Sequence, residues 1–226
     1  MSRIGRVIGV GYPHHITQRG NYRQECFADD SDRKQYLCLI REYSEKYKLK
    51  ILAYCLMDNH VHFVAMPERE DSLSRVYNVA HMRYSQYYNK RIGGYGHLWQ
   101  GRFYSCILDE RHLRAAVRYV ERNPVRAKLV ESAQEWPWSS ALTHSGQRNE
   151  KAMEMANLFS YMEGDFVEWA EYLREQDSAE QMEKIKRYTK TGMPLCGERD
   201  IKKLEQKLLR KLTVGPRGRP WPKKNK

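Results

Sequence analysis

LMDNHVHFVAM, residues 56–66, is the stretch that decides the fold of this 226-residue chain. The Asp-Asn pair inside it predicts a tight turn, with strand-forming residues on both sides. We therefore expect a β-hairpin whose strands cover residues 50–56 and 60–66. Pro67 and the acidic residues after it predict the end of the second strand.

The second strand of this hairpin carries two histidines. Successive side chains of a strand point to opposite faces, so His60 and His62 share one face and the apolar Val61 lies on the other. Two imidazoles on one face can hold a single divalent metal ion. The motif is weak by itself, and it becomes strong when the chain also supplies a third ligand and a nucleophile.

Hydrophobic periodicity and cap residues predict the other elements of the core. With the hairpin, their order predicts an α+β fold, a ferredoxin-like or RRM-like βαββαβ sandwich with an antiparallel sheet and one extra, catalytic helix. The first and third strands are then central neighbours, which places the histidine pair in the middle of the sheet. The expected elements are a strand over 14–19, a helix from about 30 to 47, a helix over 73–89, a strand over 103–108 and a helix from 110 to 123.

The extra helix has clear boundaries in the sequence. Asp109 predicts its N-cap, and Pro124 predicts its end, because the residue before a proline is driven out of the helical region. On this helix Tyr119 and Asn123 are four residues apart and share a face, with His112 on the same stripe.

Tyr119 and Asn123 suit phosphoryl transfer at a metal. A phenol is a poor nucleophile at its ordinary pKa of about 10, but it can attack phosphorus when a metal polarises the phosphate and the groups are aligned. The Asn123 amide oxygen can join two imidazoles around that metal. Such ligands suit Mg²⁺ or Mn²⁺ and leave Zn²⁺, Co²⁺ and Ni²⁺ open.

Attack by the tyrosine would leave a covalent phosphotyrosine and a free 3′-hydroxyl. The bond energy would be kept, so rejoining would need no ATP. Taken alone, a packed tyrosine and a helix-end asparagine are the simpler interpretations of Tyr119 and Asn123, and the histidine pair is what favours the catalytic one.

The composition favours a polyanionic partner. The chain carries 40 Lys and Arg against 28 Asp and Glu, a formal net charge of +12, which indicates nucleic acid or a membrane surface. No apolar run approaches the roughly 18 residues of a spanning helix, so we expect no membrane partner. The five cysteines are odd in number and lack a C-x-x-C spacing, which argues against a disulfide framework or zinc ribbon and favours a reducing cytoplasm.

The chain changes character beyond about residue 145. We divide it into a core domain at 1–145, a mostly helical basic extension at 146–213 and a tail at 214–226. Within the extension, helices are expected over 153–176, 183–189 and 201–212.

The tail contains a second signal for DNA. Pro-Arg-Gly-Arg-Pro at 216–220 resembles the core of an AT-hook, an extended segment that follows the narrow minor groove of A·T-rich DNA. Arg217 and Arg219 would then contact DNA. A basic tail that only adds salt-dependent affinity is the alternative.

Four separated motifs support one family. In chain order they are NHVH at 59–62, LWQGRF at 98–103, YVERNPVRA at 119–127 and WPWSS at 136–140. Together, over about residues 5 to 145, they resemble the REP-associated tyrosine transposases, which belong to the single-tyrosine HUH transposase superfamily.

The resemblance implies a bacterial, cytoplasmic, nucleoid-associated endonuclease and strand transferase that acts on single-stranded DNA. Its substrates would be hairpins formed by repetitive extragenic palindromes. It implies that His60 and His62 bind the metal and that Tyr119 forms a 5′-phosphotyrosine intermediate. Asn123 would occupy the third ligand position, where related transposases commonly carry Gln. Relatives include dimers with active sites built in trans, so a monomer or a homodimer is expected.

Basic residues near these motifs are candidates for DNA contacts. Arg102, Arg122 and Arg126 are expected around the cleavage site, and a solvated surface charge is the alternative for each. Polar residues on the strand over 14–19 are candidates for DNA contacts or for a structural role. Trp99 and Trp136 are candidates for stacking on bases, although the Trp-Pro-Trp setting of Trp136 favours a packing role for that residue.

Two other functions stay open from the sequence. A non-catalytic regulator on the same fold would bind nucleic acid without cutting it, and cleavage of a labelled oligonucleotide separates the two. A replication initiator or relaxase is the other alternative, although the sequence has neither the helicase motifs nor the multi-tyrosine motifs that usually accompany those enzymes.

Overall fold

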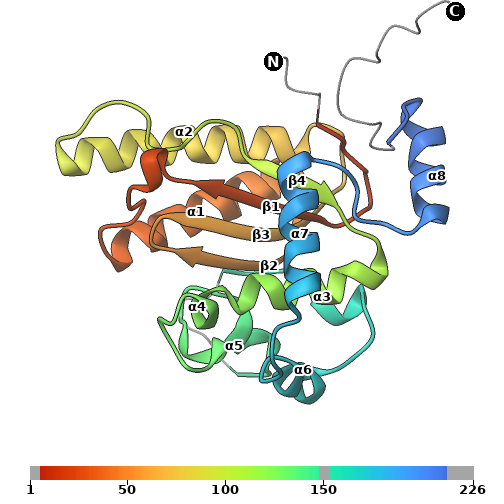
Figure 1. Cartoon of the computed structure of the whole chain (residues 1–226). Helices are drawn as coiled ribbons and strands as arrows, with labels where there is room; N and C mark the ends of the chain where they lie inside the picture. The colour runs from red at the N-terminus through yellow and green to blue at the C-terminus, as the bar shows by residue number, and fades with distance from the viewer. Residues whose placement is uncertain (1–5, 148–152, 213–226) are drawn as a thin grey trace, which may run out of the picture.

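The computed structural model describes residues 6–147 and 153–212. Its centre is a four-stranded antiparallel sheet with the strand order β2-β3-β1-β4 (Figure 1). β1 and β3 are central and β2 and β3 form a hairpin, so the predicted α+β sandwich is confirmed. The strands are β1 (His14–Arg19), β2 (Leu49–Met57), β3 (His60–Pro67) and β4 (Tyr104–Ile107).

Two long helices cover one face of the sheet. α1 (Asp30–Lys46) begins at Asp29, whose side chain accepts hydrogen bonds from two backbone N–H groups of the first turn. α2 (Ser72–Ile92) ends at Gly93, which has the left-handed φ of 65° that favours glycine. An aromatic core fills the space between these helices and the sheet, and its fully buried members include Tyr36, Tyr54, Phe63, Tyr77 and Tyr84.

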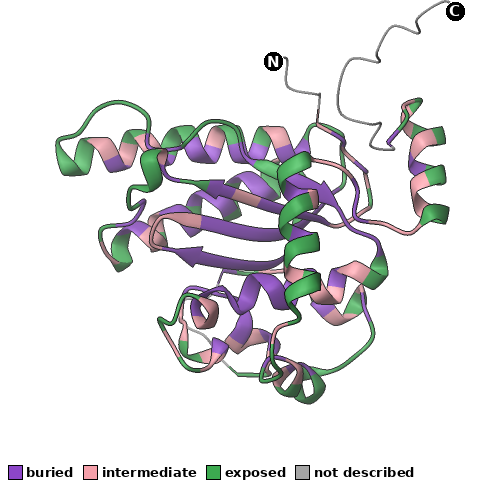
Figure 2. Cartoon of the chain, in the orientation of Figure 1, coloured by how far each residue is buried: buried purple, intermediate pink, exposed green. Residues whose placement is uncertain are grey.

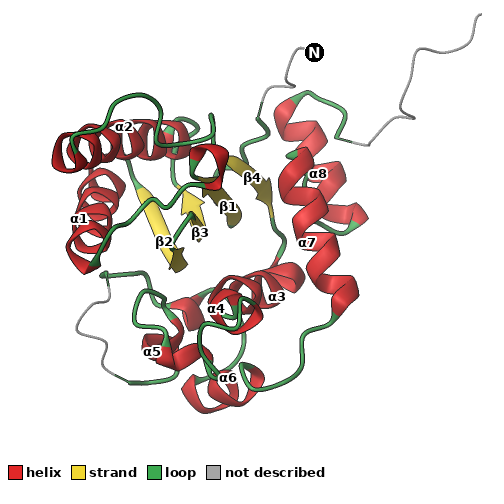
Figure 3. Ribbon diagram, turned by 60° about the vertical axis from the view of Figure 1, so that its left-hand side comes forward, coloured by secondary structure: helices red, strands yellow, loops and turns green. Residues whose placement is uncertain are grey.

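The opposite face is covered by α3 (Glu110–Glu121) and α7 (Ala179–Thr191), as the view in Figure 3 shows. The predicted N-cap of α3 is confirmed, because Asp109 accepts a hydrogen bond from the backbone N–H of His112 at 2.9 Å. α7 packs on β4, β1 and α3, while its outward side is exposed (Figure 2). The C-terminal extension therefore shares the core of the sheet, with Ile185 in the same buried cluster as the α3 residues.

Pro124 does not end the helical path of the chain, contrary to the prediction. A short helix, α4 (Asn123–Arg126), starts directly after Arg122, the C-cap of α3. A proline in the first turn of a helix costs no hydrogen bond, because the N–H that it lacks has no partner there. The result is a break at Arg122 that leaves Asn123 in a new helical turn.

The helices of the extension also differ from the prediction. The helix expected over 153–176 is confined to α6 (Phe166–Tyr172), because Asp165 accepts hydrogen bonds from two backbone N–H groups and starts a helix at that point. α7 begins earlier than expected, at its N-cap Ser178. The remaining helices are α5 (Ala141–His144), α8 (Glu198–Leu208) and 3₁₀ turns at Asn21–Arg23, Ala133–Glu135 and Leu158–Ser160. None of the described helices is both long and apolar enough to cross a membrane.

The WPWSS segment lies along the outer edge of β2. The Leu56 N–H donates to the Trp138 carbonyl at 2.9 Å, and the Ser140 N–H donates to the Tyr54 carbonyl at 3.0 Å. The indole of Trp136 donates to the Leu56 carbonyl at 2.9 Å and packs against the core, as expected. The segment therefore satisfies backbone groups that an uncovered edge strand would expose.

A buried carboxylate fixes the end of α3. Glu121 accepts hydrogen bonds from Ser140 Oγ and His144 Nδ1, both at 2.5 Å, and from the Trp169 indole at 2.8 Å. A buried carboxylate is stable only when such donors surround it. Because Glu121 follows Tyr119 by two residues, this network also sets the position of the predicted nucleophile.

Candidate active site

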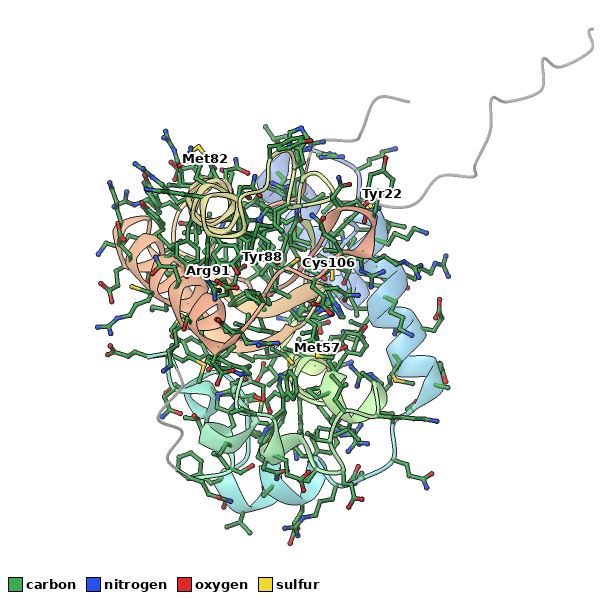
Figure 4. The ribbon with its side chains drawn as sticks, turned by 90° about the vertical axis from the view of Figure 1, so that its left-hand side faces the viewer. Tyr22, Met57, Met82, Tyr88, Arg91 and Cys106 are labelled. Carbon is green, nitrogen blue, oxygen red and sulfur yellow. The ribbon has the colours of Figure 1, made fainter. Side chains whose placement is uncertain are left out.

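A cavity of about 590 Å³ opens on the face of the sheet that α3 and α7 cover. Met57 at the end of β2, labelled in Figure 4, is one of its walls. Predicted site residues converge on this cavity from three different elements. They are His60 and His62 of β3, Tyr119 of α3, and Asn123 and Arg126 of α4.

The strand register brings three histidines together. Thr17 of β1 pairs with His62 of β3, and Arg19 pairs with His60. His15 lies on the same face of β1, and its Nε2 is 2.9 Å from Nδ1 of His62. The rings of His60 and His62 have centroids 5.0 Å apart and are nearly perpendicular, at 81°.

Hydrogen bonds leave the same nitrogen open in both predicted ligands. His60 donates through Nδ1 to the Asn59 side-chain carbonyl at 2.6 Å. His62 uses its Nδ1 toward His15 Nε2 at 2.9 Å. In the described residues no hydrogen bond reaches Nε2 of either ring. Metal-binding histidines are usually held through one ring nitrogen in this way while the other keeps its lone pair for the ion.

α7 holds the third histidine. The Thr189 hydroxyl donates to the Ile185 carbonyl at 2.8 Å and lies 2.7 Å from His15 Nδ1. Because its proton is already used, Thr189 accepts a hydrogen bond from His15. That bond makes His15 Nε2 the acceptor for His62, so one threonine fixes the tautomer of both rings. Cys106, labelled in Figure 4, lies 3.3 Å from the same hydroxyl.

Burial keeps these histidines neutral. It lowers the pKa of His60 to about 4, with Arg19 and Arg126 adding to the effect. It also lowers the pKa of His15 to about 3 and that of His62 well below its ordinary value. At neutral pH all three rings are therefore uncharged, which is the form that binds metal ions.

α3 places Tyr119 against the histidines. The Tyr119 ring meets His62 and His15 edge-on, with centroids 5.7 Å and 5.6 Å away. Asn123 donates through Nδ2 to the backbone carbonyls of Tyr119 and Val120, both at 3.2 Å. These bonds turn the amide nitrogen toward the helix, which leaves Oδ1 as the atom available to a metal.

The side chains of His60, His62 and Asn123 could hold a divalent metal ion that also binds the substrate of the protein. Two imidazole nitrogens and one amide oxygen suit Mg²⁺ or Mn²⁺ and leave positions for phosphate oxygens and water. Within residues 6–147 and 153–212, no group of three His, Cys, Asp or Glu could hold a metal. The candidate centre therefore depends on the amide of Asn123 and on oxygens from the substrate.

Arg126 covers Tyr119, the predicted nucleophile. Its guanidinium carbon lies 4.3 Å from the centroid of the Tyr119 ring, and the guanidinium also donates to the Tyr119 carbonyl. Its Nη1 is 3.6 Å from the Asp177 carboxylate but is buried without a hydrogen-bond partner among the described residues. Arg126 thus keeps a donor that a phosphate could satisfy. Burial raises the pKa of the Tyr119 phenol, and the charges of Arg126 and Arg19 oppose that rise.

Two of the predicted arginines lie away from this cavity. Arg122 is buried, pairs with Asp177 at 3.0 Å and donates to the Leu173 carbonyl, which contradicts the expected phosphate contact. Its role is to hold the segment after α6 against α3. Arg102 is exposed and lines a neighbouring cavity. Arg217 and Arg219, with the AT-hook-like segment, lie outside the described residues.

The contribution of α7 was missed in the sequence. Met182, Lys186, Thr189 and Lys190 all line the cavity. Their spacing of three and four residues puts them on one helical face, which was the available signal. The sequence pattern could not show which surface that face would meet.

Comparisons with known proteins identify the family of the chain. A model of the family described as IS200-like transposase matches residues 11–123, half of the chain. A protein of Haemophilus influenzae with the family name REP-associated tyrosine transposase is 24% identical over 149 residues, covering 57% of this chain and 84% of the relative. A solved structure of a REP-associated tyrosine transposase bound to a REP hairpin matches with a TM-score of 0.54 at 20% identity. It covers 73% of this chain and 98% of that one, and it supports the fold.

Proposed function

We propose that this chain, which belongs to the IS200-like transposase family, is a metal-dependent endonuclease and strand transferase for single-stranded DNA with Tyr119 as its nucleophile. Its resemblance to the REP-associated tyrosine transposases is confirmed. The observation that carries the proposal is that the predicted nucleophile and the predicted metal ligands meet at one cavity. Tyr119, the His60–His62 pair and Asn123 come from three elements and line one cavity.

The charge of the cavity suits a DNA strand. Arg19, Arg126, Lys186 and Lys190 line it, and none of the described residues that line it is Asp or Glu. The solved relative of matching fold holds a REP hairpin. We therefore propose hairpins of palindromic repeats, with their single-stranded flanks, as the substrate, and the bacterial cytoplasm as the place of action. Phosphate contacts from such side chains position a strand without reading its sequence.

The chemistry would follow from the residues around Tyr119. A divalent ion held by His60, His62 and Asn123 would polarise the scissile phosphate. Tyr119 Oη attacks phosphorus, the P–O3′ bond breaks, the phenolic proton passes to solvent, and the leaving 3′ oxygen takes a proton. Arg126 stabilises the charge that develops on the phosphate oxygens. Attack of another 3′-hydroxyl on the 5′-phosphotyrosine reverses these steps and joins the new strand without ATP.

The test is a covalent adduct. With Mn²⁺ and a labelled hairpin from the repeats around its own gene, the protein should form a protein–DNA band that survives denaturing electrophoresis. Tyr119→Phe should lose this band and all cleavage while DNA affinity changes by less than about threefold, because only the hydroxyl is removed. Tyr88→Phe, on the opposite face of the sheet, is the matched control and should keep the band.

Two results would reject parts of this proposal. An undiminished adduct in Tyr119→Phe would exclude Tyr119 as the nucleophile. Full cleavage in EDTA, or by His60→Ala, would exclude the metal. A protein that binds the hairpin tightly but never forms an adduct would instead be the non-catalytic regulator.

A further inference from the structure

A second cavity of about 230 Å³ adjoins the proposed active site. The two cavities share three wall residues, Tyr104, Thr189 and Lys190. Its other walls come from the segment before β1, from the start of β4 and from the C-terminal end of α7. A chain that leaves the active site past Tyr104 would enter this second cavity directly.

Three cations surround the second cavity. Arg6, Arg102 and Lys190 line it, and no Asp or Glu does so among the residues that the structure describes. Arg6 is held in place, since its guanidinium lies 3.6 Å from the centroid of the Phe103 ring and donates to the Phe103 carbonyl at 3.1 Å. Burial and the nearby charge of Arg102 lower the pKa of Arg6 to about 10. Three cationic side chains on the walls of one cavity indicate a place for an anion.

Two neighbours on β4 add polar and aromatic groups. Ser105 lines the cavity, and its buried hydroxyl has no hydrogen-bond partner in the described part of the chain. A buried hydroxyl without a partner costs free energy that a ligand would recover. Tyr104 is 42% exposed at the boundary between the two cavities, where its ring face can receive a nucleobase.

The wall formed by the C-terminal end of α7 favours a nucleotide over a free anion as the ligand. Thr191 and Gly192 bring the C-terminal end of α7 to the cavity. That end of a helix carries partial negative charge, which disfavours a bare phosphate ion. Its carbonyl groups accept hydrogen bonds, and the amino groups of nucleobases can donate them.

We infer that this second cavity binds one nucleotide of the single-stranded DNA next to the cleavage point, with its phosphate at Arg6 and Arg102 and its base stacked on Tyr104. The inference rests on the proposed function, because it takes single-stranded DNA as the substrate. It makes the cavity the part of the protein that distinguishes a flanked hairpin from a trimmed one.

Binding measurements test this assignment without any chemistry. The protein carries Tyr119→Phe throughout, and fluorescence anisotropy gives its dissociation constant for a hairpin with both single-stranded flanks and for hairpins trimmed one nucleotide at a time. Arg6→Gln/Arg102→Gln should weaken binding of the flanked hairpin by about tenfold or more and lower its salt slope by about one to two. The same variant should bind the fully trimmed hairpin as the parent does.

Matched variants separate this effect from general loss of charge. Arg75→Gln/Arg83→Gln removes two exposed charges from α2 on the opposite face, and it should not discriminate between the two hairpins. Arg102→Gln alone removes an exposed side chain and should keep the fold, so it repeats the test if the Arg6 change destabilises the protein. Tyr104→Leu should weaken binding of the flanked hairpin about tenfold, and an abasic nucleotide at the critical position should abolish that effect.

Equal losses on flanked and trimmed hairpins, or equal losses in the α2 control, would overturn the assignment. An effect of Tyr104→Leu that persists with the abasic nucleotide would overturn the stacking. These outcomes are independent of catalysis. A wild-type protein that forms no covalent adduct, yet shows the predicted discrimination, would keep the nucleotide cavity and reject the proposed chemistry.

Discussion

The two faces of the sheet bury the same kinds of side chain and use them differently. On the α1–α2 face, His81 accepts or donates a hydrogen bond at 2.9 Å from the Tyr36 hydroxyl, and its ring centroid is 4.7 Å from that of Trp99. On the α3–α7 face, His60 and His62 each use one ring nitrogen in a hydrogen bond and line a cavity with cationic walls.

The difference shows that burial alone does not identify a site histidine. Burial lowers the pKa of His81 to about 3, much as it lowers that of His15. What distinguishes the site is which residues share its cavity. His60 and His62 line one cavity together with Tyr119, Asn123 and cationic side chains. His81 also lines a cavity, but no Tyr, Lys or Arg does so among the described residues. Its ring packs against Tyr36, Tyr77 and Trp99, where an imidazole can serve packing and a single hydrogen bond.

The largest expected difference between the faces comes from removing one histidine from each. His62→Ala should abolish Mn²⁺ binding and reduce cleavage by at least about 100-fold. Even the loss of a residue that only hydrogen-bonds to a metal ligand typically lowers metal affinity or activity 10- to 100-fold. His81→Ala should leave Mn²⁺ affinity unchanged and lower the free energy of unfolding by about 1–3 kcal/mol, because it leaves the Tyr36 hydroxyl unpaired. Calorimetric Mn²⁺ titration and urea unfolding measure the two effects.

A loss of Mn²⁺ binding in folded His81→Ala protein would contradict this separation of the faces. His62→Ala protein that lost stability but still bound Mn²⁺ would also contradict this separation, because His62 would then be a structural residue.

Acid should destabilise both faces when metal is absent. The folded-state pKa is about 4 for His60 and about 3 for His81, both below the ordinary value of 6.5. Groups with a depressed folded-state pKa contribute stability that is fully present above pH 6.5 and is lost as the pH falls toward those values. Each loss should amount to a few kcal/mol. Urea unfolding in EDTA at pH 7, 6, 5 and 4 measures it.

His81→Phe provides the comparison for this acid effect. It removes one titrating group, so its unfolding free energy should fall less steeply with acid than that of the wild type. If the unfolding free energies of the two proteins fell in parallel with acid, unfolding would not change the protonation of His81. Only the α3–α7 face would then be acid-sensitive.

A smaller loss of Mn²⁺ affinity should follow from replacing Thr189, which hydrogen-bonds to His15. Thr189→Val keeps the shape of the side chain but removes the acceptor for His15, so the tautomers of His15 and His62 are no longer fixed. Mn²⁺ affinity should fall by about 10- to 100-fold while the fold is retained. Thr189→Ser should restore the affinity, and histidine ¹⁵N spectra should show a mixed tautomer in the valine variant. Unchanged affinity in Thr189→Val would mean that α7 covers the site without orienting it.

The local parts of the fold and site could be predicted because they follow short-range rules. The alternation of side chains on a strand puts His60 and His62 on one face. The helical repeat puts Tyr119 and Asn123 one turn apart. Even the break before Pro124 alters only the backbone between these two residues, and both still line the cavity.

Arg122 and Arg126 show where this reasoning stops. They are four residues apart, carry the same charge and were expected to do the same thing. Both contact Asp177, but Arg122 is buried against it and the Leu173 carbonyl, whereas Arg126 also reaches the ring of Tyr119 and lines the cavity. Their different roles depend on the segment after α6, which is more than 45 residues away in the chain.

The sequence by itself determined the hairpin, the paired histidines, the spacing of Tyr119 and Asn123 and the basic character of the chain. These are matters of local geometry and composition, which a single chain segment expresses without its neighbours. Only the tertiary structure decided that α7 lies across the sheet and that Thr189 holds His15 from 174 residues away. It also decided that a second cationic cavity adjoins the first. Such contacts depend on how distant surfaces fit together, and no periodicity within one segment encodes that fit.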